Sequence, residues 1–133
     1  MSGKPYSLQA LRTAASFAAL ILTLAVACPA LGDEDSDNAN AEAAGQRAHF
    51  VREFCGQTAD DVAQYKEQLR GVLTQASQFD LRWQAGWRRG DNDAIQMRSL
   101  RLSSPEDFKV RVKNNCSRIK WQAANSLRPR PDK

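Results

Sequence analysis

The sequence predicts an all-α fold, a small bundle of three to four helices with one long central helix, cross-linked by one disulfide. Apolar side chains recur every three or four residues between Val62 and Trp87, which is the period of a helix. Residues 104–107, Ser-Pro-Glu-Asp, form a typical helix start. The chain has neither a strand-rich region nor a series of glycine-rich hairpin turns. Its 133 residues, 42% of them hydrophobic and 26% charged, suffice for one domain.

An N-terminal signal peptide is predicted over residues 1–32. Its first part carries Lys4 and Arg12 and no acid, and an uncharged, largely apolar run extends from Thr13 to Gly32. We expect cleavage near Gly32, export to the periplasm or to the outside of the cell, and no stable transmembrane helix after processing. An uncleaved anchor is the alternative, because 20 uncharged residues approach the length that crosses a bilayer.

Cys28 provides a second alternative, in which a lipid-modified cysteine ends the signal. Small residues precede this cysteine in Ala25-Val26-Ala27-Cys28, which partly resembles a bacterial lipoprotein signal. Ala25, however, stands where such signals usually have leucine, and Pro29 follows the cysteine directly. Lipid anchoring at Cys28 is therefore the secondary prediction for this end of the chain.

A flexible acidic lead is predicted over residues 33–46. This segment has five acids, no base and no large apolar side chain, so burial offers little to offset the entropy lost on ordering. The helical domain is expected over 47–127 and a basic tail over 128–133. Residues 47–133 contain 17 basic and 10 acidic side chains, which is compatible with an acidic protein, a cell-wall polymer or an anionic membrane surface as partner.

Two helices are predicted before residue 91. The first covers about 42–55, and the second covers 58–90 with Thr58 at its start. The second helix carries a core-facing stripe whose members fall within an arc of roughly 120°. Gly71 and Gly86 weaken this helix and allow a kink or a break. The stripe consists of Val62, Tyr65, Leu69, Val72, Leu73, Ala76, Phe79, Trp83 and Trp87.

Two further elements complete the predicted bundle. Residues 91–102 are predicted as a short third helix, although alternating polar and apolar side chains there leave a strand as the alternative. The fourth helix begins at Ser104, with Pro105 as its first helical residue and acids near the positive end of its dipole. Its predicted inner face comprises Phe108, Val112, Cys116, Ile119 and Ala123.

Two cysteines, Cys55 and Cys116, remain once the signal peptide is removed. Both lie on predicted inner helix faces, and an exported protein folds in an oxidising compartment. We therefore predict a Cys55–Cys116 disulfide. A redox-active role is not expected, because the chain has no Cys-x-x-Cys pair.

The sequence offers little for catalysis, and no catalytic residue, metal site or cofactor is predicted. His49 is the only histidine, and we expect it at the surface or at a helix end. The chain has no Gly-x-Ser-x-Gly elbow and no glycine loop that could hold a phosphate. Nucleic-acid binding is not expected either, because aromatic and basic residues interleave too sparsely for base stacking.

A partner interface is predicted on the outer side of the last helix. Val110, Asn114 and Trp121 project away from the predicted inner face, and Lys113 and Arg118 flank them. An apolar and aromatic patch with cations at its rim has the composition of an interface. An alternative is that another helix or the N-terminal lead covers Trp121.

The leading interpretation is an exported, non-enzymatic helical protein that acts by binding another macromolecule. Such a protein would act as an inhibitor, immunity factor, chaperone or envelope accessory. The order of an early cysteine, a long middle and a late cysteine on a terminal helix is similar to that of small periplasmic acid-stress chaperones, which implies that acid loosens the bundle.

The alternative interpretation is a small helical enzyme with a cationic pocket for an anionic small molecule. Residues 62–66, Val-Ala-Gln-Tyr-Lys, resemble a stretch of exported, all-helical chorismate mutases over five positions. This interpretation requires several cations to converge on a concave surface. The candidates are Lys66, Arg82, Arg88 and Arg98.

Overall fold

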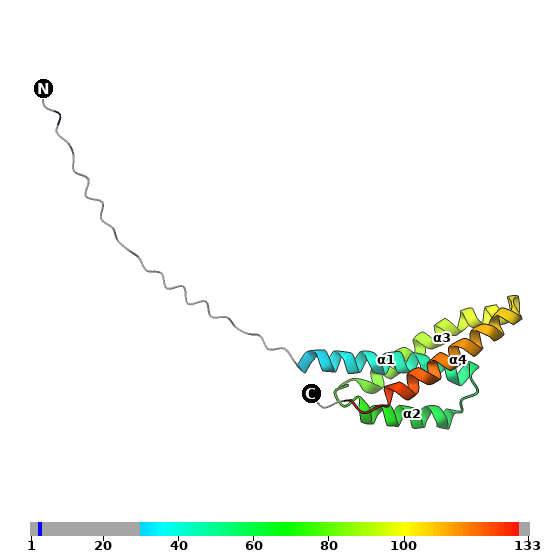
Figure 1. Ribbon diagram of the computed structural model, residues 1–133, viewed down its shortest axis with the longest axis horizontal. Coiled ribbons are helices and arrows are strands. Elements are labelled where there is room, and N and C mark those ends of the chain that lie inside the picture. The colour runs from blue at the N-terminus through cyan, green and yellow to red at the C-terminus, as the bar shows by residue number, and fades with distance from the viewer. Residues whose placement is uncertain (1–2, 4–29, 131–133) are drawn as a thin grey trace.

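The computed structural model describes Gly3 and residues 30–130. Over this part the chain forms four helices and no strand: α1 (Ala30–Phe54), α2 (Ala59–Val72), α3 (Phe79–Ser103) and α4 (Pro105–Ser126) (Figure 1). The predicted all-α bundle is confirmed. The predicted signal peptide and the alternative at Cys28 fall almost entirely outside the described residues and stay predictions. No helix within the described ranges has the length and apolar character needed to cross a membrane.

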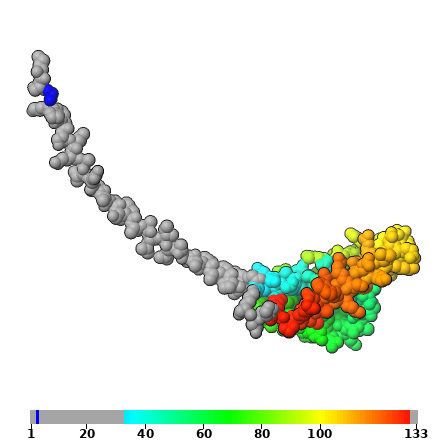
Figure 2. Space-filling view, viewed as in Figure 1, coloured from blue at the N-terminus to red at the C-terminus, as the bar shows by residue number. Residues whose placement is uncertain are grey.

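The helices form one long pair and one projecting hairpin. α1 lies along α3, whereas α2 lies on the other side of α4 in the view of Figure 1. The α3–α4 hairpin extends beyond the ends of α1 and α2, and Figure 2 shows its connecting end standing clear of the other helices. Leu102, at this end, is 86% exposed.

The prediction of a flexible acidic lead over 33–46 is wrong, because these residues belong to α1. The segment buries small residues rather than large ones, and Ala41 and Ala44 are fully covered. Asp37 is also buried: its carboxylate accepts hydrogen bonds from the Gln75 backbone N–H at 3.0 Å and from Arg130 Nη1 at 2.5 Å. An acid with two such partners is stabilised inside the fold, which composition alone does not reveal.

The predicted helix over 58–90 is divided into α2 and α3, and the break comes just after Gly71, one of the two glycines expected to allow one. The predicted stripe continues through the break, since Leu73 and Phe79 are both buried. Side chains of α1 stabilise the chain between α2 and α3 by accepting hydrogen bonds from its backbone. The side chain of Asn38 accepts a hydrogen bond from the Gln78 backbone N–H at 3.1 Å, beside the Asp37 contact described above.

Other local predictions are confirmed. α2 follows Thr58, whose hydroxyl accepts a hydrogen bond from the Asp61 backbone N–H at 3.0 Å while the Asp61 carboxylate accepts one from the Thr58 backbone N–H at 2.8 Å. Residues 91–102 are helical, so the strand alternative is wrong; they continue α3, however, so the separate third helix and the helix end at Gly90 are wrong too. Pro105 begins α4, and the Ser104 hydroxyl donates to the Asp107 carboxylate instead of capping a backbone N–H.

Glycines hold α1 and α3 at very short distance. A β-carbon at Gly86 would lie 1.8 Å from the carbonyl oxygen of Glu42, and one at Gly45 would lie 2.2 Å from that of Trp83. At Gly90 it would lie 2.7 Å from the β-carbon of His49. We name this contact the α1–α3 seam, defined by Gly45, Gly86 and Gly90. Gly86 was expected to weaken a helix, but its role here is to let two backbones touch.

The larger core side chains lie next to the seam. In the core, Leu69, Leu73, Phe79 and Trp83 form one buried cluster with the small residues of α1. Trp87 is half-buried and meets the His49 ring edge-on at 5.0 Å between centroids. The predicted stripe is therefore the core face of both α2 and α3, despite the break between them.

Candidate functional site

The Cys55–Cys116 disulfide is confirmed, with an S–S distance of 2.05 Å and a Cα–Cα distance of 5.7 Å. It joins the residue after α1 to the middle of α4, across 61 positions of sequence. α4 has few other contacts with α1, so the bridge fixes where α4 lies against the bundle.

The outer face of α4, defined by Val110, Lys113, Asn114, Arg118 and Trp121, is exposed as predicted. Val110 is 61% exposed and Trp121 64% exposed. At 3.6 residues per turn, Val110, Asn114 and Trp121 fall within an arc of about 40°. No helix of the described chain covers Trp121, and Ile119 on the opposite side is buried.

The cations of α4 are mostly unpaired. Lys109 pairs with Glu106 at 2.8 Å, and Arg118 donates to the Asn115 side chain at 3.0 Å. Within the described residues, no carboxylate pairs with the remaining cations of this helix. These are Arg111, Lys113 and Lys120.

Most cations of α2 and α3 pair with carboxylates of the same chain. Asp80 accepts contacts from both Arg70, at 2.7 Å, and Lys66, at 2.9 Å. These two cations hold the pKa of Asp80 well below its usual range, with Arg70 as the larger cause. Glu42 pairs in the same way with Arg82 at 3.3 Å and with Arg89 at 2.8 Å.

The four cations considered for an enzymatic pocket do not come together. Lys66 and Arg82 are held by the carboxylates just described, and Arg98 is held by two others at a different place. Arg88 is exposed on α3. The structure therefore does not assemble a concave cationic site from these residues.

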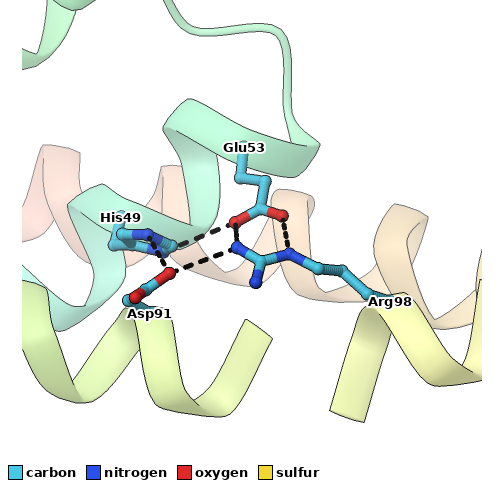
Figure 3. Close-up of polar contacts among 4 residues, drawn as sticks. All are labelled: His49, Glu53, Asp91 and Arg98. Atoms are coloured by element: carbon cyan, nitrogen blue, oxygen red, sulfur yellow. Dashed lines mark hydrogen bonds and ion pairs between the residues drawn. The ribbon is translucent and has the colours of Figure 1, made fainter. Parts of the chain in front are cut away.

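Arg98 belongs to a polar cluster between α1 and α3 (Figure 3). It donates to both carboxylate oxygens of Glu53, at 2.6 and 2.8 Å, and to Asp91 at 3.2 Å. His49 points into the same cluster, with Nε2 3.5 Å from Asp91 Oδ1 and Nδ1 3.9 Å from Glu53 Oε2. Since His49 is only 8% exposed, the expectation of a surface histidine is wrong. Gly90 makes room for it at the seam.

The cluster contains side chains of the kinds that bind metal ions, but the guanidinium of Arg98 already supplies the positive charge between them. Ligand atoms of His49, Glu53 and Asp91 lie within 4.8 Å of one another. Arg98 bonds both carboxylates, so a divalent ion would have to displace its guanidinium. The arrangement supports an internal ion network that joins the two helices of the seam.

The ion network predicts a loss of stability in acid. Hydrogen bonds from Arg98 hold the pKa of Glu53 below its ordinary value of 4.5, even though burial acts in the opposite direction. A pKa lower in the folded than in the unfolded chain adds stability above the unfolded value and loses it as pH falls through the folded value. We therefore expect urea midpoints to fall below about pH 4.5.

The variant Glu53→Gln tests this assignment. Its free energy of unfolding should be lower than that of the wild type at pH 7, and the two should converge as pH falls through the lowered pKa of Glu53 in the folded chain. Asp35→Asn, which changes an exposed acid of the same helix, should leave the acid dependence unchanged. A constant difference between wild type and Glu53→Gln from pH 7 to pH 3 would contradict the assignment.

A cavity of about 320 Å³ lies beside the disulfide, between α1, α2 and α4. Apolar side chains form most of its wall, and Arg47 and Lys120 supply positive charge. Sequence reasoning missed it because three separate helices contribute to the wall. Only Val62 and Tyr65 of the wall belong to the predicted stripe of α2.

Comparisons with protein-family models, curated proteins and solved structures gave no match for this chain.

Proposed function

We propose that this protein is an exported, non-enzymatic helical protein that binds another protein through the outer face of α4. The partner surface would be acidic and would contain an apolar pocket for Trp121. The observation that carries the proposal is the coincidence, on one helix face, of two exposed apolar side chains with cations that lack carboxylate partners in the described chain.

Charge distribution supports an acidic protein as the partner. On α2 and α3, carboxylates of the same chain neutralise most of the basic side chains, as at Asp80 and Glu42. Around Trp121, by contrast, Lys113 and Arg118 have no such carboxylate within the described residues. Carboxylates on a partner would complement these charges and speed association.

The exposed apolar groups support a specific contact. Tryptophan is enriched among the residues that dominate binding energy, especially where surrounding contacts exclude water. Trp121 and Val110 lie three helical turns apart, so they could anchor both ends of a docked segment. Scattered exposed apolar residues are common, whereas an aligned pair with a cationic border has the composition of an interface.

Export is supported by two further observations. The N-terminal residues have the pattern of a signal peptide. The Cys55–Cys116 disulfide is typical of proteins that fold in oxidising compartments. An inhibitor, an immunity factor, a chaperone and an envelope accessory all remain within this proposal.

Site-specific photo-crosslinking in the intact envelope tests the proposal. A photoreactive phenylalanine analogue at position 121 should capture one dominant protein, and the same probe at position 81 should not. Leu81 is a matched control, because it is 63% exposed but lies on α3. Equal capture from both positions, or none from position 121, would overturn the proposal.

Binding measurements with the captured protein then test the chemistry of the surface. Trp121→Ala should weaken the complex at least tenfold, as expected of a buried aromatic anchor. Lys113→Glu should weaken the complex more at low salt than at high salt, because it reverses a charge at the edge of the outer face of α4. Leu81→Asp should leave affinity unchanged. Equal affinities for wild type and Trp121→Ala would exclude this face as the interface.

A further inference from the structure

The cavity beside the disulfide has the features of a second binding site, distinct from the outer face of α4. Its volume of about 320 Å³ falls at the lower end of the range for ligand sites, about 300–1,000 Å³. Such a volume suits a small ligand. The apolar part of the wall comprises Ala48, Val51, Val62, Tyr65, Ile119 and Ala123.

Arg47 is the most informative residue of this wall. Its Nε is buried and has no hydrogen-bond partner, and no ion pair or hydrogen bond holds its guanidinium within the described residues. A guanidinium has five N–H donors, and buried donors in folded proteins are nearly always satisfied. Arg47 lines the cavity and has no acceptor within the described chain, so an anionic ligand there would give its guanidinium a partner.

The other charged groups of the wall are one cation, Lys120, and one acid, Asp61. Lys120 adds a second cation without a carboxylate partner in the described chain. Asp61 is the acid of the wall, and its Oδ2 already accepts hydrogen bonds from the backbone N–H and the hydroxyl of Thr58. These bonds hold the pKa of Asp61 below its usual range, the backbone bond being the larger cause. The carboxylate is thus committed to the α2 cap rather than to Arg47.

The polar groups do not suit a free phosphate ion. A phosphate requires several donors around it, but the Asp61 backbone N–H at the start of α2 already bonds to Thr58. The Tyr65 hydroxyl is likewise shared with Ser126 at 2.9 Å. A ligand with a single anionic group and an apolar body would use the two cations and the apolar wall together.

We infer that this cavity binds a small amphipathic carboxylate, with its anionic group at Arg47 and Lys120 and its apolar body among Val51, Val62 and Ile119. This site is independent of the proposed protein interface. The lining contains no histidine and no free cysteine, so the inference concerns binding alone.

Titration of the disulfide-bonded protein with octanoate, followed by NMR and calorimetry, tests the inference. We expect saturable binding at millimolar octanoate or below, with amide shifts grouped around the cavity. Octanol and octyltrimethylammonium should bind at least tenfold more weakly, since neither satisfies the cations. Equal binding of octanol and octanoate, or no saturable shift with octanoate, would overturn the inference.

Three variants locate the site. Arg47→Gln should weaken octanoate binding at least tenfold, and Lys120→Gln, which changes an exposed side chain and should preserve the fold, about threefold or more. Arg111→Gln removes an exposed cation of α4 outside the cavity and should have no effect. An equal loss in Arg111→Gln and Lys120→Gln would show non-specific surface attraction only.

Trp121→Ala separates this inference from the proposed protein interface. The variant should bind octanoate as the wild type does while losing the protein partner. Ala123→Leu should have the opposite effect, because it fills the cavity. Loss of octanoate binding in Trp121→Ala, with the fold intact, would contradict the separation of the two sites.

Discussion

Replacement of Gly86 by alanine is expected to lower the free energy of unfolding by more than about 3 kcal/mol. The added β-carbon would lie 1.8 Å from the carbonyl oxygen of Glu42, and neither backbone can relax without moving a helix. The seam would have to open, and contacts on both sides would weaken. Urea and thermal unfolding followed by circular dichroism measure the effect, with a fall of more than about 10 °C expected in Tm.

Gly71→Ala is the matched control for this experiment. Gly71 is an exposed residue of α2, and a β-carbon there would meet nothing within 4 Å. Alanine in a helix is intrinsically favoured over glycine by about 1 kcal/mol, so this variant should be slightly more stable than the wild type. The same substitution should therefore have opposite signs at the two positions. A stabilising or neutral Gly86→Ala would contradict the close approach of α1 and α3.

Removal of the Cys55–Cys116 bridge is expected to cost about 4 kcal/mol. The bridge closes a loop across 61 positions, and in the chain-entropy model a loop of this length restricts the unfolded chain by about that amount. Small domains are commonly stable by only about 5–15 kcal/mol, so the loss is a large fraction of the total. Unfolding of the Cys55→Ser/Cys116→Ser double variant in urea measures it.

The reductant response provides the control for the disulfide. Dithiothreitol should destabilise the wild type by a similar amount and should leave the double variant unchanged. α4 should lose protection from amide exchange first, because the bridge is its main attachment to α1. A difference below about 1 kcal/mol between oxidised and reduced wild type would contradict the assigned contribution.

Local signals in the sequence predicted several features correctly. Thr58 caps α2 and Ser104-Pro105 marks the start of α4, and helical spacing put Cys55 and Cys116 on inner faces where they meet. The same spacing identified Trp121 as exposed. These features depend on neighbours within one or two helical turns, so a single sequence contains the information needed.

Features set by distant contacts could not be predicted in this way. The acidic half of α1 is ordered because Asp37 and Asn38 bind backbone groups 38 and 40 residues away. The break between α2 and α3 depends on the same bonds. A glycine within a helix can mark a bend or a close contact with a second helix, and its neighbours in sequence are the same in both cases. The contact of Gly86 with α1 could therefore be recognised only in the tertiary structure.

The two candidate sites differ in how far the sequence alone predicts them, for the same reason. Positions 110, 114 and 121 lie on one helix, so their common face follows from its period. The cavity takes Arg47 from α1, Val62 from α2 and Lys120 from α4. The burial of His49 likewise depends on Gly90 of another helix. Sites assembled from several helices require the tertiary arrangement before their residues can be recognised.

The ion pair between Asp37 and Arg130 also affects when the protein can fold during synthesis. These residues lie 93 positions apart, and Glu42 of the seam meets Arg82 across 40 positions. A chain that emerges from the ribosome N-terminus first therefore presents α1 without its packing partner until α3 has followed. Asp37 gains its counter-charge only once Arg130 has been synthesised. The complete set of contacts around α1 therefore forms only after the segment that follows α4 has been synthesised.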